Sequence, residues 1–168
     1  MISQNPSVAV VMGSKSDYET MENTVQVLSD FGLDCETRVI SAHRTPDVAS
    51  DFAGNAKERG LKIIIAAAGK AAHLAGVMAA HTPIPVIGVP MKTSDLGGLD
   101  SLLSTVQMPG GVPVATTAIG RAGAKNAALL AVQMLSLSDE DLAQRLDEYR
   151  REMADTVRQA DEKIRGER

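Results

Sequence analysis

The chain has 168 residues, enough for one domain with a proper hydrophobic core. Hydrophobic residues make up 44% of it and charged residues 23%, which is the balance of a globular protein and excludes a disordered chain. A net charge of -4, with 2% aromatic residues and no Trp, argues against a nucleic-acid-binding protein, because such proteins use basic surfaces and stacking rings. Small-molecule chemistry is therefore favoured.

The single cysteine, Cys35, predicts neither a disulfide framework nor a metal site built from several thiolates. Residues 1–7 lack a basic region followed by an apolar run, and no apolar stretch reaches the roughly 20 residues that cross a bilayer. We therefore expect a cytoplasmic protein without membrane contact.

The N-terminal part of the chain predicts two units, each a β-strand followed by an α-helix. Residues 7–12 are a continuous, Val-rich apolar run, as expected of a parallel strand buried on both faces. Ser16 or Asp17 is expected to cap the helix that follows, and Gly32 to end it. Its inner face is formed by Met21, Val25 and Leu28 at helical spacing.

The second unit begins with a strand at residues 35–40. Thr45 as N-cap and Pro46 at the first helical position are expected to start its helix, which runs to Arg59 and is closed by Gly60. The side chains expected on its inner face are Ala49, Phe52, Ala53 and Ala56.

The alternation continues through the middle of the chain. It predicts strands at 61–68, 85–89 and 112–118, and helices at 71–80, 99–106 and 122–135. Alternating strands and helices imply right-handed crossovers and a parallel sheet covered on both faces. We therefore expect a flavodoxin-like three-layer αβα sandwich over residues 1–137.

Residues 138–168 predict an extra C-terminal helix, capped by Ser138, with charged pairs at Asp141/Arg145 and Asp147/Arg151. One narrow apolar stripe runs along it, made of Leu142, Leu146, Tyr149, Met153, Val157 and Ile164. The stripe could pack on its own domain, but so long a charged helix overhangs a domain of this size. Docking on a neighbouring subunit is favoured.

Polar residues gather where three of the predicted strands end. His43 and Arg44, within residues 41–45 that begin with Ser41, follow the second strand and offer a proton carrier and an anion clamp. Alone, this pair would be read as loop residues facing water. The carboxyl ends of parallel strands meet at one edge of a sheet, so we expect the pair to lie near the ends of the first and third strands.

The end of the first strand, residues 13–17, is a glycine turn with hydroxyl groups at a helix N-terminus. Free backbone N–H groups there favour an anion, Ser14 and Ser16 add donors, and Arg44 could close on the same phosphate. Asp17 would repel phosphate, so it either accepts hydrogen bonds from ribose hydroxyls or is only a helix cap.

Other ligand classes fit poorly. The Gly69-Lys70 pair lacks the remainder of a P-loop, and no G-x-G-x-x-G occurs. None of His43, His73 and His81 has a carboxylate at a metal-ligand spacing, so no metal is predicted, and His81 in particular is expected in a core or loop role. The ligand class that remains is a small sugar phosphate, which would react by proton transfer without a cofactor.

Several long motifs resemble class I N5-carboxyaminoimidazole ribonucleotide mutases, the carboxyl-shifting enzymes of purine biosynthesis. The resemblance runs from about Val8 to Leu135. Its motifs are Val11-Met12-Gly13-Ser14-Lys15-Ser16-Asp17, residues 41–46, Ala71-Ala72-His73-Leu74, and residues 85–90, 99–102 and 106–109.

The resemblance implies a flavodoxin-like homo-octamer that binds its ribonucleotide through Ser14, Asp17 and Arg44 and uses His43 as acid and base. In the implied reaction the carbamate leaves the exocyclic nitrogen as CO2, and C4 of the imidazole attacks the trapped CO2. The candidate substrate-binding residues are Ser14, Ser16, Asp17, Ser41, Arg44, Gly69, Lys70, Ala71, His73 and Leu74.

Three residues depart from the family pattern, which has Gly, Gly and Pro where this chain has Ala67, Lys70 and Ala75. The related class II enzymes, which carboxylate aminoimidazole ribonucleotide directly with CO2, carry a basic residue at the place of Lys70, whereas His73 and Arg44 follow class I. Direct carboxylation, or a non-catalytic module that binds a nucleotide monophosphate, therefore remain alternatives, and Lys70 could be a solvent-facing loop residue.

Overall fold

The computed structural model describes residues 6–166. Residues 1–5, which belong to the N-terminal stretch considered above, and residues 167–168 of the expected C-terminal helix lie outside the described residues. The strands are β1 (Val8–Met12), β2 (Cys35–Val39), β3 (Ile63–Ala68), β4 (Val86–Pro90) and β5 (Ala115–Thr116). The helices are the 3₁₀ turn η1 (Lys15–Asp17) and α1 (Tyr18–Asp30), α2 (Pro46–Gly54), α3 (Leu74–His81), α4 (Leu99–Val106), α5 (Arg121–Ser136) and α6 (Glu140–Gly166). The chain divides into two compact units between Ala131 and Val132.

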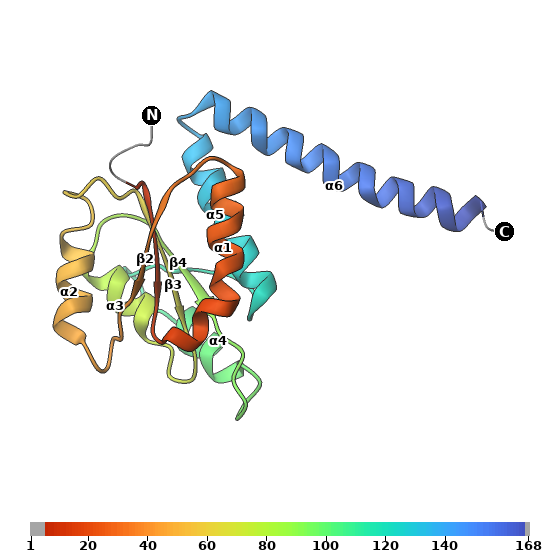
Figure 1. The fold of residues 1–168 in the computed structure, drawn as a ribbon. Helices are drawn as coiled ribbons and strands as arrows, with labels where there is room; N and C mark the ends of the chain where they lie inside the picture. The colour runs from red at the N-terminus through yellow and green to blue at the C-terminus, as the bar shows by residue number, and fades with distance from the viewer. Residues whose placement is uncertain (1–5, 167–168) are drawn as a thin grey trace. The chain divides into compact units, whose positions relative to one another are not determined.

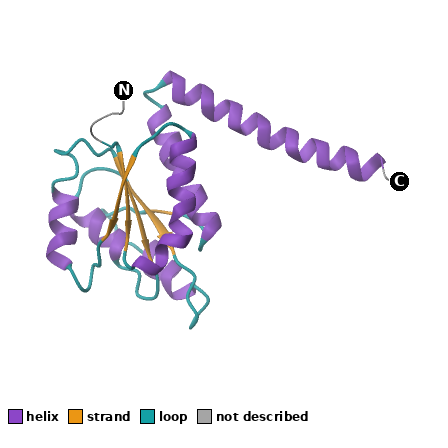
Figure 2. Ribbon diagram, viewed as in Figure 1, coloured by secondary structure: helices purple, strands orange, loops and turns teal. Residues whose placement is uncertain are grey.

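The strands form one parallel sheet in the order β2-β1-β3-β4-β5 (Figure 2). In β1, Val10 pairs with Thr37 of β2 on one side and with Ile65 of β3 on the other. All of β1 and most of β3 are buried, which explains why both read as unbroken apolar runs. The predicted flavodoxin-like α/β fold is confirmed, and its winding reverses between β1 and β3, where such folds bind ligands.

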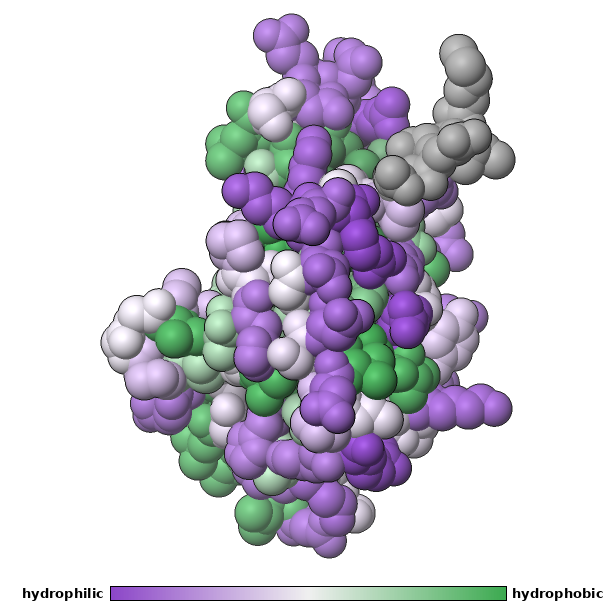
Figure 3. Space-filling model, turned by 90° about the vertical axis from the view of Figure 1, so that its left-hand side faces the viewer, coloured by the Kyte–Doolittle hydropathy of each residue, from purple (hydrophilic) through white to green (hydrophobic). Residues whose placement is uncertain are grey.

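Helices cover both faces of the sheet (Figure 1). On one face α2 and α3 pack against each other over a core that includes Phe52, Ile64 and Met78. On the other face the Thr24 hydroxyl of α1 donates a 2.8 Å hydrogen bond to the Ala124 carbonyl at the start of α5. Seen from the side on which α2 lies, the surface is mostly hydrophilic with separate hydrophobic patches, which is ordinary for a folded domain (Figure 3).

Several elements are shorter than the sequence predicts: the helix expected at 71–80 begins at Leu74 and the strand expected at 61–68 begins at Ile63, and α2 and β5 differ most. Helix α2 ends at Gly54 rather than Arg59, and residues 55–60 form turns, although the predicted inner face including Ala56 is buried as expected. Strand β5 has two residues rather than seven, because Pro113 has no N–H to donate to a sheet ladder.

Asp17 and Thr45 stand at the N-cap positions of α1 and α2 as expected, but neither side chain makes a cap hydrogen bond. The Ser14 side chain accepts the hydrogen bond of the Ser16 N–H and caps η1, whereas Asp17 makes no side-chain cap at α1. The Thr45 side chain does not cap α2, since its hydroxyl donates to the Ser41 carbonyl and accepts from the Ser41 N–H, both at 3.0 Å. These polar side chains therefore stabilise the turns at the strand ends.

In the second unit, the cap of α6 is Asp139 rather than Ser138, because the Asp139 carboxylate accepts the Leu142 N–H at 2.9 Å. The Arg151 guanidinium donates to the backbone carbonyl of Asp147, not to its carboxylate. Along the stripe, Leu142 and Leu146 are buried, while Met153, Val157 and Ile164 are 47%, 69% and 62% exposed. No helix in residues 6–166 is long and apolar enough to cross a membrane.

Candidate active site

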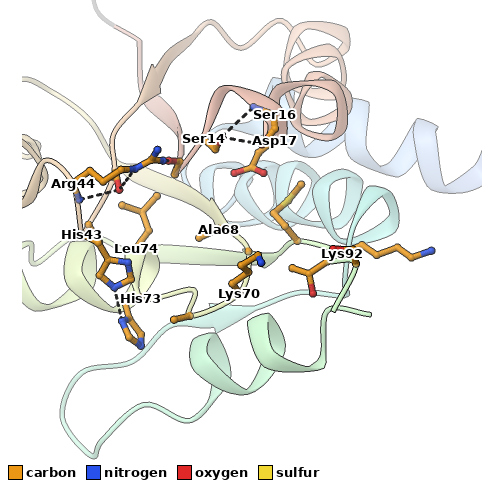
Figure 4. Close-up of a pocket in the computed structure, with 18 residues that line it drawn as sticks. Ser14, Ser16, Asp17, His43, Arg44, Ala68, Lys70, His73, Leu74 and Lys92 are labelled. Carbon is orange, nitrogen blue, oxygen red and sulfur yellow. Dashed lines mark hydrogen bonds between the residues drawn. The ribbon is translucent and has the colours of Figure 1, made fainter. Parts of the chain in front are cut away.

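A pocket of about 740 Å³ lies at the carboxyl ends of the sheet strands (Figure 4). Every candidate site residue from the sequence lies at it. Its lining consists of Gly13, Ser14, Ser16, Asp17, Ser41, Ala42, His43, Arg44, Ala68, Gly69, Lys70, Ala71, His73, Leu74, Met91, Lys92, Thr93 and Ser94. The pocket thus joins the loops that follow β1, β2, β3 and β4.

The β1–α1 turn presents hydroxyl groups and a carboxylate to this pocket. The Ser16 hydroxyl donates to Ser14 Oγ at 2.9 Å, and the Asp17 N–H donates to the Ser14 carbonyl at 3.1 Å. Burial raises the pKa of Asp17, while hydrogen bonds with the Ser14 backbone and the Ser16 side chain partly offset that rise. A ligand hydroxyl that donates to Asp17 would favour its charged form.

The β2–α2 turn holds the Arg44 guanidinium beside the β1–α1 turn. Arg44 Nη2 donates to the Gly13 carbonyl at 2.9 Å, and Arg44 Nε donates to Ser41 Oγ at 3.3 Å. Ser41 Oγ also accepts the Arg44 backbone N–H at 3.1 Å. These contacts fix the cation next to the serine turn, so both can meet one anion.

Two imidazoles from different turns meet at the pocket. His43 Nε2 lies 2.8 Å from His73 Nδ1, and the two rings are edge to face, with 86° between their planes and 4.9 Å between their centroids. At that distance one nitrogen must carry the hydrogen and the other must accept it. The pair can therefore hold a single proton between the rings.

The β3–α3 loop runs close to the β4–α4 loop. A Cβ on Gly69 would lie 3.3 Å from Thr93 Cγ2 and 3.5 Å from Met91 Cβ, so glycine permits the approach. Lys70 Nζ lies 2.6 Å from Asp95 Oδ2. Each charge stabilises the other, mainly through this hydrogen bond, which raises the pKa of Lys70 and lowers that of Asp95.

Sequence reasoning missed the wall that follows β4, which consists of Met91, Lys92, Thr93 and Ser94. The signal was present, because β4 is a parallel strand of the same sheet and its end must reach the same edge. His81, by contrast, is the exposed last residue of α3 and lies outside the pocket, with 3.4 Å between its Nδ1 and Ser50 Oγ, so the expected core or loop role was wrong. Within residues 6–166 no group of three or more His, Cys, Asp or Glu side chains is arranged to hold a metal ion.

Known proteins resemble this chain in sequence and in fold. The family model described as AIR carboxylase matches residues 7–156. The chain belongs to the AIR carboxylase family. The N5-carboxyaminoimidazole ribonucleotide mutase of Bacillus subtilis (strain 168) is 55% identical over 159 residues, which cover 95% of this chain and 98% of that relative. The mutase of Brucella melitensis biotype 1 is 57% identical over 150 residues, which cover 89% and 93%.

A solved structure agrees with the fold of this chain. PurE of Treponema denticola matches with a TM-score of 0.83 and 29% identity, covering 93% of this chain and 96% of that one. The family resemblance predicted from the pocket motifs is therefore confirmed, and the match extends past those motifs into α6.

Proposed function

We propose that this chain moves the carboxyl group of N5-carboxyaminoimidazole ribonucleotide from the exocyclic nitrogen to C4, giving 4-carboxy-5-aminoimidazole ribonucleotide in purine biosynthesis. The observation that carries the assignment is identity of 53% or more with relatives named for this mutase, over nearly the whole chain. The enzyme would need no cofactor, since the rearrangement is redox-neutral. The C–N bond that breaks and the C–C bond that forms both lie within the substrate, and the enzyme exchanges only protons with it.

The polar end of the pocket suits the ribose phosphate. The Ser14 and Ser16 hydroxyls and the Arg44 guanidinium converge on the β1–α1 turn, which offers both donors and positive charge to a phosphate. Asp17 follows Ser16 at the end of η1 and can accept hydrogen bonds from ribose hydroxyls. Ser41 contributes by holding Arg44.

The imidazole ring of the substrate would then face His43 and His73. As the N–C bond of the carbamate breaks and CO2 departs, His43 gives a proton to the exocyclic nitrogen; C4 then attacks CO2, and the C4 proton returns to His43. One imidazole can serve both steps because its ordinary pKa lies near neutrality. His73, 2.8 Å away, holds the ring in place.

The remaining wall would confine the CO2 released between these steps. Gly69, Ala71 and Leu74 present backbone and aliphatic groups there, so little in this wall competes for a small apolar molecule. CO2 that is kept next to C4 can react there without being bound tightly by the protein, because it is already close to the atom that attacks it. Lys70, also at this wall, is paired with Asp95.

We further propose that the protein acts in the cytoplasm as a homo-octamer, in which α6 docks on a neighbouring subunit. The exposed Met153, Val157 and Ile164 would be covered by that contact. Truncation after Leu137 should therefore weaken assembly in analytical sedimentation. A truncated protein of unchanged oligomeric size would show that α6 is not an interface element.

Separate supply of the two substrates tests the reaction. Purified enzyme should convert N5-carboxyaminoimidazole ribonucleotide without added CO2. Turnover of aminoimidazole ribonucleotide with CO2, but not of the carbamate, would instead establish direct carboxylation. Binding without turnover of either substrate would leave the non-catalytic nucleotide-binding module.

A further inference from the structure

An ion pair joins the two loops on one side of the pocket. Lys70 lies in the β3–α3 loop and Asp95 lies 25 residues later in the β4–α4 loop, with 2.6 Å between Nζ and Oδ2. Their side chains are 70% and 58% exposed, so the pair lies at the rim. Lys70 itself lines the pocket.

The backbone at Lys70 is in a conformation that needs support. Its φ is 58°, and no other non-glycine residue among residues 6–166 has a positive φ. Left-handed backbone is disfavoured for a residue with a Cβ. The residue that bears this strain is also the one tied to the opposite loop, so the contact can stabilise the strained turn.

The other contacts between the loops are nearer the sheet. The Met91 N–H donates to the Ala68 carbonyl at 2.9 Å, and Gly69 packs against Thr93. Beyond Gly69, the loop continues through Ala71 to His73, whose N–H donates to the Ala71 carbonyl at 2.8 Å. A shift at Lys70 would therefore move the segment that presents His73 to His43.

We propose that Lys70 is a positioning residue, whose ion pair with Asp95 holds the β3–α3 loop against the β4–α4 loop and keeps the pocket in the shape that binds the ribonucleotide. The inference rests on the proposed function for its substrate. Lys70 then acts by fixing the position of the β3–α3 loop, and its ammonium group pairs with Asp95 rather than with the substrate.

Loss of the pair should raise KM and leave kcat nearly unchanged. Without it, only a fraction of the free enzyme has the binding shape, and apparent affinity falls by that fraction, whereas saturating substrate restores the shape. Since exposed ion pairs contribute modestly, KM should rise about two- to fivefold. The wild-type advantage over the variants should shrink at high salt, which screens the pair.

The test compares Lys70→Ala, Asp95→Asn and the double variant. Both single variants should raise KM similarly, and the double variant should be no worse than either, because all three lose one interaction. The exchanged pair Lys70→Asp with Asp95→Lys should recover much of the wild-type KM. Lys57→Ala, on an exposed turn after α2, controls for the loss of one positive charge.

Opposite effects of the single variants would overturn the proposal. If Lys70→Ala raised KM while Asp95→Asn lowered it, Lys70 would bind substrate directly and Asp95 would compete for it. An unchanged KM in both would show that the pair is incidental.

Hydrogen exchange of the ligand-free protein separates this inference from the assigned reaction. Amides of residues 69–72 and 92–96 should exchange faster in both single variants, with the thermal unfolding midpoint close to that of the wild type. Unchanged exchange there would overturn the positioning role whatever substrate the enzyme uses.

Discussion

The two sides of the pocket are held together in different ways. On one side, the Arg44 side chain of the β2–α2 turn donates to the Gly13 carbonyl, and this bond joins it to the β1–α1 turn. Arg44 also donates to Ser41 in its own turn. On the other side, beyond the close packing at Gly69, an exposed pair of Lys70 and Asp95 joins the loops. In the proposed reaction, the first side would place the groups for proton transfer and phosphate binding, and the second would adjust around the substrate. Substitutions on the first side should therefore cost more.

His43→Asn should have the largest effect. Asn keeps polarity and approximate size but carries no titratable proton, so turnover should fall by roughly 10²–10⁴ with substrate still saturating. The measurement is kcat and KM across pH, and the wild-type profile should bend where an imidazole titrates. Near-normal turnover would assign the proton carrier elsewhere, with His73 as the next residue to replace.

Arg44→Lys should come second and act on affinity. A lysine cannot reproduce the planar contact with phosphate or the simultaneous bonds to Gly13 and Ser41, so KM should rise about 10- to 100-fold. Arg38→Lys, an exposed change on β2, is the matched control. An unchanged KM in Arg44→Lys would place the guanidinium off the phosphate.

Asp17→Asn should have the smallest effect in the ligand-free protein, where it acts on stability; loss of its proposed contact with the ribose hydroxyls would appear separately, as a raised KM. Burial raises the pKa of Asp17 above its ordinary 3.8, so the folded state holds this proton more tightly than the unfolded state. Stability due to this group is therefore lost as pH rises from 3.8 through the raised pKa. The variant should unfold at an equal or slightly higher temperature than wild type at pH 7, and at the same temperature near pH 3.

Thermal unfolding at the two pH values measures this difference, with the exposed Asp34→Asn as the charge control. Clear destabilisation of Asp17→Asn at pH 7 would mean that the carboxylate is a net stabilising group in the ligand-free protein.

The sheet and much of the site could be predicted because both follow from short-range rules. Buried parallel strands read as apolar runs, and their carboxyl ends meet at one edge, which was enough to bring Ser14, Arg44 and His73 together. The resemblance to mutases added the expected roles of these residues. Arg44 donates to the Gly13 carbonyl, beside the turn at which it is predicted to close on a phosphate.

Other features depend on contacts that no local pattern encodes. The Lys70–Asp95 pair joins residues 25 apart through the shapes of two irregular loops. The cap position of α2 was predicted but its hydrogen bond was not, because a threonine side chain can bond to a turn as readily as to a helix end, as Thr45 does with Ser41. The early end of α2 at Gly54 was missed because the apolar spacing continues to Ala56 within a turn.

The central claim is that the carboxyl carbon moves within one bound substrate, and isotopic labelling tests it most directly. Substrate labelled in its carbamate carbon would be converted in the presence of excess unlabelled CO2, and the product analysed by mass spectrometry. Retention of the label in the C4 carboxyl group is predicted, since CO2 is trapped beside C4. Product that carries the unlabelled carbon of the surrounding pool would contradict the mutase mechanism.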